Sequence, residues 1–121
     1  MNSMPVYRCC QPGLLFDAVD GDADIFLDLA RVFHHETIAR FDDIARASAA
    51  GAFNEMGYEA HSLKGTAGAV GAAELVQLLQ DIEHDGLRLR RPCSDAQLSA
   101  LRQLLQQARE DMDAFVHILQ K

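Results

Sequence analysis

The chain has 121 residues and a formal net charge of −7, with 49% hydrophobic and 24% charged residues. This composition is ordinary for one globular domain with its own core, and the length is too short for two domains. The acidic balance argues against general binding of nucleic acid and against docking to anionic membranes.

The sequence has no evident membrane-spanning segment, secretion signal or cysteine-based metal site. No apolar run approaches the roughly 20 residues of a membrane-spanning helix, and the N-terminus lacks the basic-then-apolar pattern of a secretion signal. Cys9, Cys10 and Cys93 lack metal-ligand spacing, and we expect free thiols in a reducing compartment. These features favour a cytoplasmic protein.

The predicted elements begin after a flexible N-terminal tail, residues 1–11, which shows no hydrophobic periodicity. Pro12 suits the first turn of a short helix that ends at Gly21. We expect this helix to lie across the end of a larger structure. Residues 12–121 are predicted to form a single domain, and the Met1 start with a short tail favours a free-standing protein.

A long amphipathic helix is predicted next, with an N-cap at Asp22 or Asp24 and a break at Gly51. It would have about seven turns. Its apolar residues recur at steps of three and four, which indicates one buried face. They are Phe26, Leu29, Ala30, Phe33, Thr37, Phe41 and Ile44.

The third predicted helix has a plausible N-cap at Asn54 and carries the stretch Gly57–Gly71. Its core face comprises Met56, Leu63, Ala67 and Val70. Glu59 falls on the core side of the helical wheel, where a charge is out of place. We expect Glu59 to reach solvent at the end of the bundle or to pair with Arg40 or Arg46 of the preceding helix.

Two further helices complete the chain. One is expected over residues 72–85, with Gly86 stopping it. The last follows a linker that contains Pro92 and begins at a capping box of Ser94 and Gln97. No segment alternates with period two, so strands are not expected. The elements predict an all-α protein, an antiparallel four-helix bundle with a short additional N-terminal helix.

One stripe of the third helix has an unusual composition. At about 100° per residue, His61 shares an arc with Gly57, Gly65 and Gly68. Each interior glycine costs on the order of 1 kcal/mol relative to alanine, so the bare face lowers helix stability. Lys64 follows His61 by one turn on the same flank. The stripe predicts a histidine that a bulky partner can reach.

The chemistry of this stripe suits phosphoryl transfer. Neutral imidazole is a competent nucleophile near pH 7, because its unperturbed pKa is about 6.5. A phosphoryl group on His61 would carry negative charge that Lys64 could offset. An isolated histidine on a helix is usually a solvated surface residue, but the glycines and Lys64 favour the functional interpretation.

A family resemblance rests on these residues. The pattern Ala-His-x-Leu-Lys-Gly-x-Ala is present at residues 60–67, followed by a downstream Gly-Ala, by Leu75 and by the pair Ile82-Glu83. It resembles the pattern of the histidine-containing phosphotransfer (HPt) domains of bacterial phosphorelays. The likeness covers nearly the whole chain, since that family is a four-helix bundle with its histidine in the middle of the second long helix.

The resemblance implies a role for each matching residue. His61 would accept a phosphoryl group on Nε2 from a phospho-aspartate receiver domain and pass it to the aspartate of another receiver. Lys64 would help to hold the phosphate, while Gly65 and Gly68 would keep the docking face open. Gly57 extends that face, although it is not a fixed feature of the family. The matching glutamate, Glu83, is expected to be structural.

The resemblance also implies the partners. They would be receiver domains of hybrid sensor kinases and of response regulators, which would bring the Mg²⁺. We expect no intrinsic cofactor and no autonomous kinase activity, and the chain holds no glycine-rich phosphate loop. A bundle with its own closed core is expected to be a monomer.

Two other functions stay open at this stage. One is a helical-bundle adaptor that is never phosphorylated and binds a receiver or another protein through the same glycine-lined face. The other is a metal-binding bundle, suggested by His34-His35-Glu36 and by Asp81-x-x-His84. Di-iron bundles pair two Glu-x-x-His motifs, whereas this chain has a single related spacing, so we expect no metal.

The arginines at Arg88, Arg90 and Arg91 form a basic cluster in an otherwise acidic chain. We interpret them as a solvated loop. The alternative is that they help to attract the acidic rim of a receiver.

Overall fold

Helices fill almost the whole chain. The computed structural model describes residues 6–121, so the first five residues of the predicted tail lie outside the described part. The elements are α1 Pro12–Ala18, α2 Ala23–Ala49, α3 Phe53–Ala69, α4 Ala73–His84, the π-helix η1 Asp85–Leu89 and α5 Asp95–Leu119. No strand occurs within residues 6–121, and none of the helices described there is long and apolar enough to cross a membrane.

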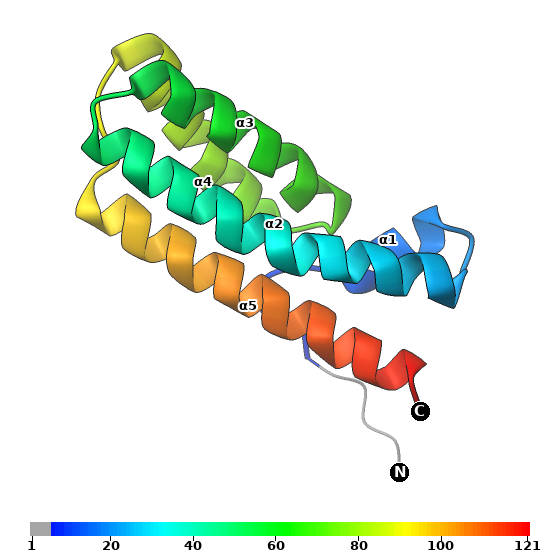
Figure 1. Cartoon of the computed structure of the whole chain (residues 1–121). Helices are drawn as coiled ribbons and strands as arrows, with labels where there is room; N and C mark the ends of the chain where they lie inside the picture. The colour runs from blue at the N-terminus through cyan, green and yellow to red at the C-terminus, as the bar shows by residue number, and fades with distance from the viewer. Residues whose placement is uncertain (1–5) are drawn as a thin grey trace.

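The four long helices form an antiparallel bundle (Figure 1). Helix α3 packs against α2 and α4, and α5 packs against the same two helices. Helix α1 contacts α5 and α2 near the C-terminal end of α5. This arrangement confirms the predicted four-helix bundle with an additional short N-terminal helix.

The core runs through the centre of the bundle and holds α3 in place despite its glycines. Large side chains that are fully buried come from every long helix. They are Phe26, Ile44, Met56, Leu63, Leu75, Leu79, Ile82, Leu101, Leu105 and Met112. Each such side chain contributes about 1.5–3 kcal/mol on burial, which outweighs about 1 kcal/mol for each glycine in a helix interior.

Two predicted N-caps are confirmed and one is wrong. The Asp22 carboxylate accepts a hydrogen bond from Ile25 N–H at the start of α2, and Ser94 with Gln97 forms the capping box of α5. Helix α3 begins instead after Ala52, without a side-chain cap. Asn54 lies inside its first turn, where its side-chain oxygen accepts a hydrogen bond from Arg90.

The predicted stop at Gly86 is also wrong. The chain passes from α4 directly into η1 and turns only at Arg90, which has a φ of 51°. Gly86 is instead packed against the start of α3, where an added Cβ would lie 2.6 Å from the Phe53 carbonyl oxygen. The glycine therefore allows two backbones to approach each other rather than ending a helix.

The N-terminal segment is attached to the bundle before α1 begins. The backbone N–H groups of Arg8, Cys9 and Cys10 all donate to the carboxylate of Asp111 on α5. Gln11 N–H donates to a carbonyl oxygen of the α3–α4 turn. The predicted flexible tail is therefore wrong for residues 8–11, because one buried carboxylate satisfies three consecutive backbone donors.

Candidate functional site

His61 lies in the middle of α3 with its ring toward solvent. Its side chain is 63% exposed. Gly65 and Gly68 are exposed on the same helix face, and a Cβ added to either would meet no atom within 4 Å. The surface around the ring is thus bare on this side, as the stripe predicted.

Gly57 does not belong to that open surface, and its predicted place on the docking face is wrong. It is buried, and an added Cβ would lie 2.6 Å from Cγ of Leu87 on η1. The absence of a side chain at Gly57 makes room for η1 rather than for a partner. Helix periodicity placed it beside His61, but only the fold shows that η1 covers it.

Glu83 on α4 connects the two polar residues of the α3 face. Its Oε2 lies 2.9 Å from Nδ1 of His61, and its Oε1 accepts a hydrogen bond of 2.7 Å from Nζ of Lys64. The Glu83 side chain is 20% exposed and that of Lys64 is 26% exposed. Lys64 is therefore engaged with a carboxylate and is only partly exposed.

The ionisation of Glu83 decides which nitrogen of His61 is available. Burial alone would raise the pKa of Glu83, but hydrogen bonds from Lys64 and His61 and their charges outweigh it, so the pKa is lowered. At neutral pH Glu83 is a carboxylate and can only accept hydrogen bonds. It therefore favours the tautomer with the proton on Nδ1, which leaves the lone pair of Nε2 unprotonated.

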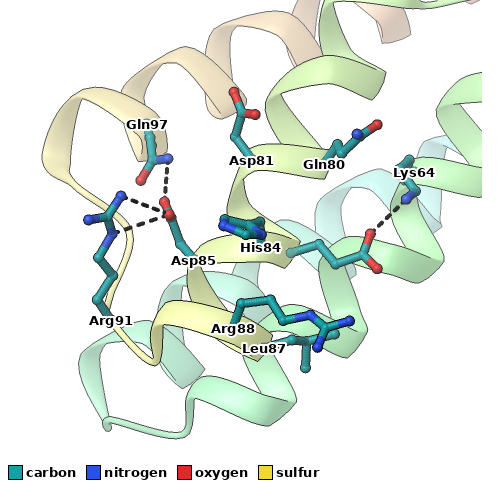
Figure 2. A pocket seen from close by; sticks show the side chains of 10 residues that line it. Lys64, Gln80, Asp81, His84, Asp85, Leu87, Arg88, Arg91 and Gln97 are labelled. Carbon is teal, nitrogen blue, oxygen red and sulfur yellow. Dashed lines mark hydrogen bonds and ion pairs between the residues drawn. The ribbon is translucent and has the colours of Figure 1, made fainter.

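His61, Lys64 and Glu83 form a trio of polar side chains. A polar groove runs beside Lys64 and Glu83, between the end of α4, η1 and the start of α5. It has a volume of about 730 Å³, and its lining includes Lys64, Glu83 and Arg88. Figure 2 shows Asp85 at the far end of the groove, bonded to Arg91 and Gln97. The groove thus joins the His61 site to the basic segment that follows α4.

Comparison with known protein families shows which family the chain belongs to. A model of the Hpt domain matches residues 28–111, which include all three residues of the trio. The chain belongs to the Hpt domain family. No curated protein and no solved structure matches the chain.

Hpt domains act in histidine phosphotransfer within two-component phosphorelays, as phosphocarriers rather than kinases, and they interact with receiver domains. In this Hpt domain the sequence pattern located His61 and Lys64, and the structure brings both to one carboxylate. Glu83, which was expected to be structural, contacts both of these residues. The sequence signal for Glu83 was its place in the motif. A pattern along one helix cannot show that Glu83 on α4 faces His61 on α3.

Two other ion pairs involve residues singled out in the sequence. Glu59 pairs with Arg40 of α2, which confirms one of the two expected pairings. Arg91 pairs with the buried Asp85, so the basic cluster is only partly a solvated loop. Within the described residues 6–121, no three His, Cys, Asp or Glu side chains are grouped so as to hold a metal ion.

Proposed function

We propose that this Hpt domain accepts a phosphoryl group on Nε2 of His61 from the phospho-aspartate of one receiver domain and passes it to the aspartate of a second receiver. The observation that carries the proposal is the contact between Glu83 and Nδ1 of His61. That contact leaves Nε2 as the nucleophilic atom, on a ring that is exposed beside Gly65 and Gly68.

The transfer step balances with the groups at hand. The lone pair of Nε2 attacks phosphorus, the Nε2–P bond forms, and the P–O bond to the aspartate breaks, with the carboxylate leaving as the anion. The ring of His61 then carries a positive charge, which the Glu83 carboxylate stabilises through the Nδ1–H hydrogen bond. The second transfer reverses these bonds, with the aspartate of the second receiver as nucleophile.

Positioning rather than acid–base chemistry is the main contribution of the domain. Phosphoryl transfer passes through a loose transition state whose stabilisation is mostly electrostatic and geometric. Lys64 supplies a cation one turn from His61, and Glu83 fixes the ring. We propose that the Mg²⁺ that commonly assists such transfers is brought by the receiver.

The receiver is proposed to cover an apolar stripe on α2 as well as the α3 face. Ile25, Leu29 and Val32 are 47%, 36% and 55% exposed. They follow one another at steps of three and four, and the same stripe continues to Arg40, which bonds to Glu59 of α3. Only the Arg40 end of this stripe is placed beside α3 by a contact, and we propose that a domain seated over His61 extends along α2 to cover the apolar side chains.

The test is phosphotransfer from labelled receivers of the source organism. Wild-type protein should acquire an acid-labile, base-stable label, and His61→Gln should lose it while keeping the helical circular dichroism of the wild type. His35→Gln is the matched control, because His35 is an exposed histidine on α2, and it should retain the label.

Two results would contradict the proposal. Equal labelling of the His61→Gln variant would show that the acceptor is another residue. Failure of every receiver to label the wild type, together with binding of a receiver, would favour the alternative of an adaptor that is not phosphorylated.

A further inference from the structure

The charges around His61 leave the phosphorylated state short of a cation. Lys64 and Glu83 form an ion pair of 2.7 Å, so their charges cancel. A phosphoryl group adds about 1.5 to 2 negative charges at neutral pH, of which the positive charge on the phosphorylated ring offsets one. Lys64 alone, already shared with Glu83, does not balance that addition, so a second cation near the ring would be favourable.

Among the three arginines that follow α4, Arg88 alone has no hydrogen bond or ion pair within residues 6–121. Arg90 donates to the Asn54 side chain at 2.9 Å, and Arg91 pairs with Asp85 at 3.0 Å. Arg88 is exposed. Its guanidinium therefore has all five N–H donors available for a ligand, whereas Arg90 and Arg91 already use some of theirs.

Arg88 lines the same groove as Lys64 and Glu83. In the view of Figure 2, its side chain extends away from Asp85 and toward the end of the groove where Lys64 lies. The packing of η1 against α3 fixes the position of Arg88 along α3, because the neighbouring Leu87 packs against Gly57. Gly57 lies four residues before His61, which corresponds to about 6 Å along the helix axis.

We propose that Arg88 binds the phosphoryl oxygens of phospho-His61 together with Lys64. This inference rests on the function proposed above and adds a phosphate-binding residue to that site. The planar guanidinium can donate two parallel hydrogen bonds to phosphate oxygens, which an ammonium group cannot do. The groove beside η1 is then the side of the site that holds the phosphoryl group, and the glycine face of α3 is the side left for the receiver.

A phosphate-binding role and a receiver-docking role for Arg88 have different consequences. The transition state for hydrolysis resembles metaphosphate and carries less charge on the phosphoryl group than phosphohistidine does. A cation on these oxygens therefore stabilises phosphohistidine more than that transition state, and it lengthens the lifetime of the isolated phosphoprotein. A residue that only attracts the receiver changes transfer rates in both directions and leaves that lifetime unchanged.

The experiment labels the wild type and three variants from one receiver, removes the receiver, and follows loss of the phosphohistidine. Arg88→Ala should shorten the lifetime by about two- to five-fold, the range of an exposed ion pair. It should also shift the phosphoryl equilibrium toward the receiver by a similar factor. Arg88→Lys, which keeps the charge and loses the fork, should fall in between, and Arg90→Ala should match the wild type.

Several results would overturn the inference. They are an unchanged lifetime and equilibrium in Arg88→Ala, an equal effect in Arg90→Ala, or slower transfer with no change in lifetime, which would assign Arg88 to receiver docking. Circular dichroism of each variant checks the fold. Absence of label on the wild type would instead refute the proposed function, and this inference with it.

Discussion

At the scale of single residues, Glu83 connects the two polar residues of the α3 face through its two oxygens. One oxygen faces Nδ1 of His61 and the other accepts from Lys64. A carboxylate can serve both partners at once, whereas an amide offers one acceptor and one donor group. Replacing Glu83 by glutamine, which has the same shape, should therefore weaken one of these two contacts.

Glu83→Gln should lower the rate of phosphotransfer to His61 by about tenfold. The amide can accept from only one of the two partners, and it carries no charge to stabilise the phosphorylated ring. Hydrogen bonds to charged groups are worth about 1 kcal/mol more than neutral ones. Rapid-quench transfer from a receiver measures the effect. Glu74→Gln, an exposed glutamate on the same helix, is the control, and an equal loss there would contradict the assignment.

The pH dependence of stability follows from the lowered pKa of Glu83. A group whose pKa is lower in the folded state stabilises the fold above its unfolded pKa, and this contribution is lost as the pH falls through the folded value. The difference in unfolding free energy between wild type and Glu83→Gln should therefore be constant near pH 7 and shrink below 4.5, the ordinary pKa of the group. Urea titrations at several pH values measure it, and a difference that grew in acid would contradict the sign.

At the scale of elements, the glycines of α3 meet two different demands. Gly57 makes room for Leu87 of η1, whereas Gly65 and Gly68 face open space. The first kind of glycine is required for packing. The second kind lowers helix stability without any benefit to the fold, so we expect its benefit to lie in access to His61.

Gly65→Ala should separate stability from function. Alanine has the higher helix propensity and meets no neighbouring atom, so the free energy of unfolding should rise by about 0.5–1 kcal/mol. Transfer from a receiver should become slower, because the added methyl group stands on the face that the receiver approaches. Thermal unfolding and transfer kinetics measure the two effects, and a stabilised variant with an unchanged rate would remove Gly65 from the docking face.

Gly86→Ala, on η1, should destabilise the fold, in contrast to Gly65→Ala. Its Cβ would lie 2.6 Å from a backbone oxygen of Phe53, which cannot move aside as a side chain would. We expect the free energy of unfolding to fall by about 1–3 kcal/mol.

At the scale of the whole molecule, the N-terminal segment joins parts of the bundle that are far apart in the sequence. Asp111 on α5 holds the backbone of residues 8–10, and Gln11 N–H bonds to the Val70 carbonyl oxygen at 2.7 Å. The segment thus links α5 to the turn that ends α3. The carboxylate is buried, and its hydrogen bonds offset the unfavourable transfer of a charge from water.

Asp111→Ala should lower the free energy of unfolding by about 2–4 kcal/mol, because the variant leaves three backbone donors without their acceptor and one of them is buried. Urea denaturation followed by circular dichroism measures the change. Asp113→Ala, an exposed aspartate half a turn further along α5, should stay within about 0.5 kcal/mol of wild type. Equal stability of the two variants would show that the attached segment adds nothing to the fold.

The sequence alone determined most of the helices and indicated His61 as the proposed nucleophile. Periodic apolar residues, the Asp22 cap and the Ser94–Gln97 capping box are local signals, so α2 and α5 were predicted close to their observed bounds. His61 and its neighbours form a contiguous motif on one helix. These features need no knowledge of the other helices, because the forces that produce them act within a few residues.

Only the tertiary structure decided the roles of Gly57, Gly86 and Glu83 and the attachment of the N-terminal segment. The two glycines serve a contact between α3 and η1, and Glu83 reaches His61 from α4. Asp111 lies about a hundred residues from the backbone groups that it binds. Each of these roles depends on which surfaces meet when the helices pack, and the order of residues along one helix does not encode which partner will lie opposite.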